Sequence, residues 1–328
     1  MYNESIKVLL NNSSKVINLS TFSVITANFG IIIIVLGVIF NTMTLLIFRL
    51  DKELKKMPSI VILSFVCVTD TLSLFTWNLD HFLIKYDFSI ENVNIVTCKI
   101  FIFMQYASLE ISGLLLSLCL IDRYFTVASK PGSLFSKLPF GTFKTSLIWS
   151  ISIISFICLL NSYLLFADRM FVGKKKKLDC YILANGFKVY DIWDKIHIFI
   201  YCFFPFLIMT VFNIFLIRKT RLSRKINNIT NKISAKINNE SNQLNKKNLT
   251  HTLLIISIAF LIMTLPSTIA YGFLAEKYKN NETIMNIFYL LDYLASFNHS
   301  ILFFHCFFSN KKFRMCVFNI FNCYKFQM

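Results

Sequence analysis

The chain has 328 residues, of which 55% are hydrophobic and only 16% are charged, whereas soluble domains are roughly 45–50% apolar and about 25% charged. This composition excludes a disordered chain and argues against an ordinary cytosolic enzyme. The net charge of +17 would indicate nucleic acid as a partner of a soluble protein. Here the basic residues gather between long apolar stretches, so we expect a lipid bilayer as the partner and no nucleic acid.

Seven apolar stretches are each long enough to cross a bilayer, which takes about 20 mostly apolar residues. In chain order they cover residues 23–48, 58–83, 95–126, 143–167, 196–217, 251–273 and 283–308. The sequence therefore predicts an all-α membrane protein, a seven-transmembrane helical bundle. The Lys- and Asn-rich segment 218–248 has little apolar periodicity and predicts a loop flanked by helix extensions. Residues 309–328 start with a basic, amphipathic run that predicts a short helix along the membrane surface.

Charge sets the expected orientation, because Lys and Arg are enriched in cytoplasmic segments. Most of the 34 basic residues lie in inner segments if the N-terminus is outside, although Lys174–Lys177 oppose this bias from an outer loop. We therefore expect an extracellular segment 1–22, a membrane domain 23–308 with cytoplasmic loop 218–248, and a membrane-surface helix and short cytoplasmic tail 309–328, all at the plasma membrane. Glycosylation sequons that would lie outside the cell begin at Asn3, Asn11, Asn12, Asn18 and Asn281. We therefore expect a glycoprotein.

Short motifs mark the stretches one after another. They are Gly37 to Asn41 in the first, Asp70 in the second, Cys98 at the start of the third and Asp122-Arg123-Tyr124 at its end, Trp149 in the fourth, Pro205 in the fifth, Phe260 and Pro266 in the sixth, and Phe313-Arg314 after the seventh. Each motif alone is weak evidence. Their order and spacing together are specific.

This series resembles the rhodopsin-like (class A) family of G-protein-coupled receptors over about residues 23–322. The seventh stretch, at residues 298–309, looks most like that of invertebrate neuropeptide-type receptors. The resemblance implies a cell-surface receptor, not an enzyme, that binds an extracellular ligand and activates a heterotrimeric G protein. Arrestin is a further implied partner. No cofactor is implied beyond an allosteric sodium ion.

The resemblance also implies roles for individual residues. Asp122, Arg123 and Tyr124 would meet the G protein. Asp70 would be the sodium carboxylate, with Ser112 and Asn298 as further members of that polar cluster. Cys98 and Cys180 would form a disulfide, and Pro205 and Pro266 would be helix hinges. Cys323 lies just past the amphipathic run 313–321 and is a candidate for palmitoylation.

Several positions depart from the family pattern. The Asn-Pro-x-x-Tyr motif of the seventh stretch reads Leu302-Phe303-Phe304-His305-Cys306, and the toggle Trp is Thr264. The supporting Tyr of the fifth stretch is Asn213, and Gly113 occupies an aliphatic position of the transmission triad. Lys246 stands where the acidic partner of Arg123 is expected, so we expect only Asp122 to restrain Arg123. The alternative function is therefore a ligand-binding protein with weak, constitutive or no G-protein signalling.

Besides Asp122 of the Asp-Arg-Tyr motif, four carboxylates lie within the stretches, at Asp70, Asp80, Glu110 and Asp292. Each costs about 2.5–3.5 kcal/mol in a bilayer if unpaired, so we expect all four to face the bundle interior. Asp80 and Asp292 fall at the depth of the family's ligand pocket, where no Lys or Arg is expected in any stretch. We expect these two acids, with Trp77, Gln105 and Tyr271, to bind a peptide that carries Arg or Lys near an amidated C-terminus. The opposing interpretation is that the two acids bond to one another or to backbone.

Other seven-helix classes fit less well. A retinal protein needs a Schiff-base Lys that residues 283–308 lack, and a transporter would show internal repeats. Gln105 stands where receptors for amines carry Asp. The five His residues form no metal-ligand pattern, and no phosphate-binding loop is present, so we expect no enzymatic activity.

Overall fold

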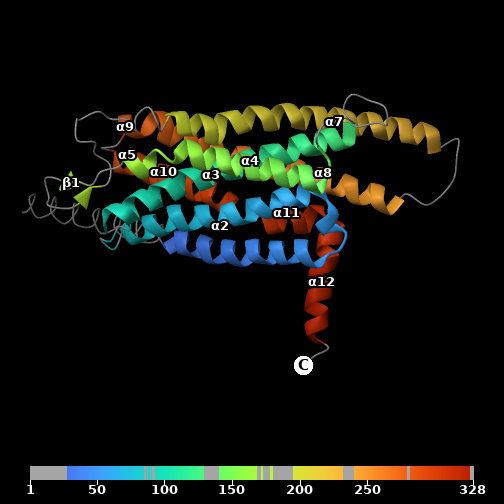
Figure 1. Cartoon of the computed structure of the whole chain (residues 1–328), viewed down its shortest axis with the longest axis horizontal. Helices are drawn as coiled ribbons and strands as arrows, with labels where there is room; N and C mark the ends of the chain where they lie inside the picture. The colour runs from blue at the N-terminus through green and yellow to red at the C-terminus, as the bar shows by residue number, and fades with distance from the viewer. Residues whose placement is uncertain are drawn as a thin grey trace, which may run out of the picture.

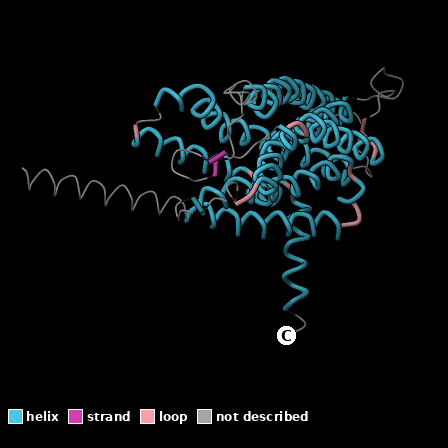
Figure 2. Tube along the Cα trace, turned by 60° about the vertical axis from the view of Figure 1, so that its left-hand side comes forward, coloured by secondary structure: helices cyan, strands magenta, loops and turns pink. Residues whose placement is uncertain are grey.

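The computed structural model describes residues 28–84, 86, 88, 90, 93–128, 140–167, 171–172, 178–179, 195–231, 240–278 and 281–325. Within this part of the chain, six helices are long and apolar enough to cross a membrane, and one bent pair of helices makes a seventh span. The spans lie side by side along the long axis of the molecule (Figure 1). Figure 2 shows that nearly all of the described backbone is helical. The predicted seven-transmembrane bundle is confirmed.

The first span is the helix Asn28–Leu50. The short helix η1 (Leu54–Lys56) leads into α2 (Pro58–Ile84), and α3 (Ile95–Ala128) is the longest helix. The fourth span is divided into α4 (Phe143–Asn161) and α5 (Leu164–Ala167) by a turn that the apolar pattern did not predict. The strands β1 (Phe171–Val172) and β2 (Leu178–Asp179) form an antiparallel pair in the following connection.

The last three spans contain irregular turns. The fifth, Lys195–Arg221, includes the π-helical segment η3 (Phe199–Phe203) and continues in α7 (Phe204–Asn231). The sixth comprises α8 (Glu240–Ile269), the π-helical segment η4 (Ala270–Leu274) and α9 (Ala275–Tyr278), and the seventh comprises α10 (Glu282–Asn298) and α11 (Leu302–Ser309). The predicted helix extensions into 218–248 are confirmed by α7 and α8. Residues 232–239 of that predicted loop, and 23–27 of the first predicted span, lie outside the described residues.

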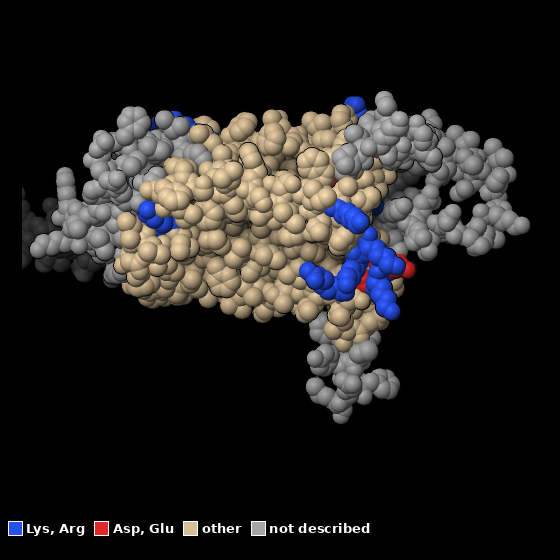
Figure 3. Space-filling model, in the orientation of Figure 1, with Lys and Arg blue, Asp and Glu red and all other residues tan. Residues whose placement is uncertain are grey.

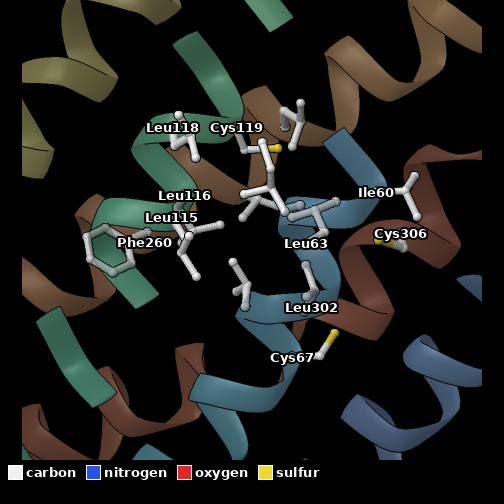
Figure 4. Close-up of a cluster of buried hydrophobic side chains, with 14 of the residues drawn as sticks. Ile60, Leu63, Cys67, Leu115, Leu116, Leu118, Cys119, Phe260, Leu302 and Cys306 are labelled. Carbon is white, nitrogen blue, oxygen red and sulfur yellow. The ribbon is translucent and has the colours of Figure 1, made fainter. Parts of the chain in front are cut away.

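The third helix lies at the centre of the bundle and contacts α2, α4, α7 and α8. The main hydrophobic cluster is built around it, with Leu115 and Phe260 fully buried. Figure 4 shows how side chains from α2, α3, α8 and α11 converge in this cluster. Leu302, which stands in place of the family's Asn, lies in the same cluster and is 3% exposed. The apolar packing therefore extends to the position where a polar side chain was expected.

The seventh span bends by 53° between α10 and α11 although it contains no proline. A break of this kind frees backbone carbonyls that need new hydrogen-bond donors within a membrane. The Nδ2 of Asn41, on the first helix, donates to the carbonyl of His299 at 3.0 Å, and the hydroxyl of Ser300 donates to the carbonyl of Phe297. The break is therefore stabilised by side-chain donors.

The helix α12 (Lys311–Lys325) leaves the bundle and runs across the direction of the spans (Figure 1), as expected for a helix along the membrane surface. Phe313 anchors it and is fully buried against Phe48 and Phe303. The Sγ of Cys316 donates to the Oδ2 of Asp51 at 3.1 Å. Burial, followed by the bond to Asp51 and its charge, raises the pKa of Cys316 to about 11, so this cysteine remains a protonated donor at neutral pH.

We predict that Asn41→Leu lowers the stability of the bundle by roughly 1–3 kcal/mol, because it leaves the carbonyl of His299 buried without this donor. Thermal unfolding of the purified protein in detergent measures the loss. Thr44→Val is the matched control, since Thr44 is equally buried on the same helix but donates only to the carbonyl of Phe40 within it. Equal losses in the two variants would contradict the role assigned to Asn41.

Candidate functional site

A cavity of about 720 Å³ opens between α2, α3 and the fifth, sixth and seventh spans. It lies toward the end of the bundle where α3 begins, and Arg123 lies toward the other end of that helix. Four of the five predicted ligand-binding residues line it, namely Trp77, Gln105, Tyr271 and Asp292. The fifth, Asp80, lies in α2, but its side chain is outside the described part of the chain.

The Asp292 carboxylate is part of the cavity wall and is 9% exposed. It accepts hydrogen bonds from the indole Nε1 of Trp77 on α2 and from the hydroxyl of Ser267 on α8, the latter at 3.2 Å. These neutral donors tie three spans together and hold the carboxylate in place. Lys195 also lines the cavity, so the expectation that no Lys or Arg lies at this depth is wrong. It was missed because it immediately precedes the predicted apolar stretch.

A second carboxylate, Glu110 on α3, lies fully buried beside the cavity. Its Oε2 accepts from the Nδ2 of Asn161 at 2.7 Å, and its Oε1 lies 2.9 Å from the Nδ1 of His197. His197 lines the cavity, and its ring packs on those of Tyr106 and Tyr201. Glu110 therefore joins α3 to the fourth and fifth spans and orients the imidazole of His197. His197 belongs to none of the sequence motifs that mark the spans.

The third carboxylate, Asp70 on α2, has its Oδ1 within 2.5 Å of the hydroxyl of Ser112 and 2.6 Å of the Nδ1 of His299. All three residues are buried. The predicted pairing of Asp70 with Ser112 is thus present. His299, rather than the neighbouring Asn298, completes the cluster. A hard cation such as sodium takes oxygen ligands. The described residues do not fit one here, because a ring nitrogen lies against the carboxylate.

Three buried polar atoms at the cavity lack a hydrogen-bond partner among the described residues. They are the Oδ1 of Asn78, the hydroxyl of Tyr271 and the Nε2 of His299. Buried polar atoms are nearly always paired in native proteins, so unpaired ones indicate a missing water or ligand. All three residues line this one cavity, where a water or a ligand with hydrogen-bonding groups would pair them.

The region below the cavity connects it with the centre of the bundle. Gly113 allows α3 to approach the fifth span closely, since a Cβ there would lie 3.0 Å from the carbonyl oxygen of Tyr201 and 3.5 Å from the ring of Phe260. Phe260 thus fills the space left by the missing aliphatic side chain. Pro205 is the second residue of α7, two residues after the π-helical turn η3, and Pro266 lies inside α8 four residues before η4. Such turns and prolines are the usual places where helices bend.

At the opposite end of α3, the carboxylate of Asp122 accepts hydrogen bonds from residues that lie outside the sixth span. It accepts from the backbone N–H of Gly141 at 2.8 Å and from the hydroxyls of Ser59 and Ser146 at 3.4 Å. Gly141 has a φ of +81°, a conformation that favours glycine. Asp122 therefore fixes the connection that precedes α4.

The guanidinium of Arg123 instead reaches the sixth span. Its Nε donates to the hydroxyl of Thr250 at 3.0 Å, and the residue is 4% exposed. The expectation that only Asp122 restrains Arg123 is therefore wrong, because a neutral threonine of α8 takes part. Tyr124 packs against Phe212 and Phe215 of α7. The side chain of Lys246, the residue predicted to repel Arg123, lies outside the described part.

The fifth and sixth spans are also joined by a polar pair. The Nδ2 of Asn213 donates to the hydroxyl of Ser257 at 2.8 Å, and both residues are buried. Asn213 stands where the family carries Tyr. Ser309 of α11 donates to the hydroxyl of Thr252 at 2.7 Å, which ties the end of the seventh span to α8. These contacts join the fifth and seventh spans to the sixth.

Two of the remaining predictions extend beyond the described residues. Cys98 is buried and disulfide-bonded, but Cys180 lies outside the described residues, so the pairing of these two stays a prediction. Cys323 lies in α12, and its side chain is likewise outside them.

Comparison with known proteins identifies the family of this chain. Residues 40–302, well over half of the chain, match the family model of the 7 transmembrane receptor (rhodopsin family). No individual curated protein matches the chain significantly. The matched range covers the cavity, the Asp70 cluster and the Arg123 end of α3. The chain therefore belongs to the rhodopsin family of seven-transmembrane receptors, the class A G-protein-coupled receptors.

Proposed function

We propose that this receptor binds an extracellular peptide in the cavity and passes the signal to a heterotrimeric G protein at the Arg123 end. The observation that carries this proposal is the cavity itself, with a buried carboxylate and three unpaired polar atoms in its wall. Its volume lies in the usual range for a drug-sized ligand, about 300–1,000 Å³. It therefore suits one end of a peptide, and the remaining residues would lie outside.

The charge of the cavity favours a cationic group on the ligand. Asp292 is buried and bonded to neutral donors, whereas Lys195 is exposed. The buried carboxylates Asp70 and Glu110 each have a His beside them. Asp292 is therefore the acid best placed to attract an Arg or Lys side chain. A free terminal carboxylate would be repelled at the same place, so we propose an amidated C-terminus, as for a neuropeptide.

Surface charge supports an extracellular N-terminus and a plasma-membrane location. On the face shown in Figure 3, Lys and Arg gather where α12 leaves the bundle, and the middle of the face has none. Basic residues mark the cytoplasmic side of membrane proteins. The α12 end would then face the G protein, with arrestin as a second partner, and the cavity would open outside.

Arg123 and Thr250 offer a two-state contact for signalling. In this structure the guanidinium of Arg123 binds Thr250 of α8, and an outward movement of α8 would release it. Pro266 lies between this contact and the cavity, and the π-helical turn η4 forms part of the cavity wall; both would allow the sixth span to bend. The alternative, a receptor that binds its ligand with weak, constitutive or no G-protein signalling, rests on the lost motifs at Thr264 and Leu302.

We predict that Asp292→Asn lowers the potency of a basic, amidated peptide agonist at least tenfold, equivalent to about 1.4 kcal/mol. Reporter cells for calcium and cyclic AMP measure it. Glu53→Gln is the control, because Glu53 pairs with Lys312 at the opposite end of the bundle. Unchanged potency in both Asp292→Asn and Asp80→Asn would refute the cationic contact.

We predict that Thr250→Val raises basal guanine-nucleotide exchange several-fold, because it removes the hydroxyl that holds Arg123 to α8. Exchange on purified G protein in membranes tests this. Thr252→Val is the matched control, since Thr252 lies two residues away and binds Ser309 instead. The restraint is disproved if the two variants have the same basal rate as the unchanged receptor.

We predict that Cys98 and Cys180 form one disulfide that ties α3 to the outer loop. Cysteines exported to the cell surface oxidise, and Cys98 is already disulfide-bonded. Peptide mapping of the purified protein without reduction should recover the two cysteines in one cross-linked fragment. Recovery of a free thiol at Cys180 would exclude the pairing.

A further inference from the structure

In the Asp70 cluster, the imidazole of His299 lies where the family pattern implies a sodium ion. The Oδ1 of Asp70 receives both the hydroxyl of Ser112 and the Nδ1 of His299, at 2.5 and 2.6 Å. His299 is 2% exposed and Asp70 is 3% exposed. The carboxylate oxygen that would bind a cation is thus already covered on two sides.

The seventh span also lacks a side-chain oxygen that the family pattern provides. Leu302 replaces the Asn of the family motif and packs in the main hydrophobic cluster. Sodium needs oxygen atoms around it. The cluster has lost a side-chain oxygen at position 302 and gained a ring nitrogen at position 299.

The backbone keeps His299 in this place. His299 follows the last residue of α10, and its carbonyl accepts from Asn41 at 3.0 Å. The break between α10 and α11 therefore presents the imidazole to α2 with both the backbone and the Nδ1 held. The imidazole therefore does not leave the carboxylate without breaking a buried hydrogen bond at Nδ1.

We propose that His299 is a built-in replacement for the sodium ion, and that it closes the Asp70 site of this receptor to sodium. The site is filled by a side chain of the protein itself, so the link between α2 and the seventh span needs no ion. Removal of the imidazole should open the site, because Asp70 and the hydroxyl of Ser112 would then face a space of imidazole size.

The test is the thermal unfolding midpoint of the purified receptor in sodium chloride and in choline chloride at equal ionic strength. The unchanged receptor should unfold at the same temperature in both salts. His299→Ala should be less stable, and sodium should raise its midpoint by roughly 2–4 °C, because an ion that binds only the folded state stabilises it. Asp70→Asn combined with His299→Ala should abolish that rise.

His305→Ala is the matched control, since it removes a partly buried imidazole from the same span without touching the Asp70 cluster. It should give no difference between the two salts. If His299→Ala cannot be purified, His299→Asn keeps a polar side chain there and should show the same gain. A sodium response in the unchanged receptor, or none in both His299 variants, would overturn the proposal. This readout needs neither ligand nor G protein, so its outcome is independent of the proposed function.

Discussion

Buried carboxylates are the constraint on which this bundle depends. Asp70, Glu110 and Asp292 are each less than one-tenth exposed within membrane-spanning helices. A carboxylate in such a place is costly unless donors surround it. In every case the hydrogen-bond partners come from other spans. They are His299 and Ser112 for Asp70, His197 and Asn161 for Glu110, and Trp77 and Ser267 for Asp292. Each acid therefore acts as a clamp between spans.

These interhelical contacts also surround the cavity. His197, His299 and Asp292 all line it, so a ligand that contacts its wall contacts the groups that hold the helices together. Below it, neutral side chains of the fifth and sixth spans supply the hydrogen bonds. Thr250 binds Arg123, and Asn213 binds Ser257. The chain has lost several family motifs, yet the described part retains contacts that join the same spans.

Much of the fold could be predicted from sequence because apolar length and charge are local properties. All seven spans and the surface helix were found in this way, and so was the burial of Asp70, Glu110 and Asp292. The partners of these acids could not be predicted, because they come from residues far away in the chain. His299 is 229 residues from Asp70, and no periodicity links the two. The break at His299 was missed because no proline marks it, and Lys195 was missed because it lies at the edge of an apolar stretch.

If the cavity and the Arg123 end form one signalling unit, ligand-driven nucleotide exchange on a G protein depends on both. The receptor is placed in lipid discs with purified heterotrimeric G proteins and challenged with basic peptides that carry an amidated C-terminus. The account predicts that a peptide which binds the cavity accelerates exchange, and that Arg123→Ala abolishes the acceleration while binding persists. A peptide that binds the cavity and accelerates exchange on no class of G protein would contradict it.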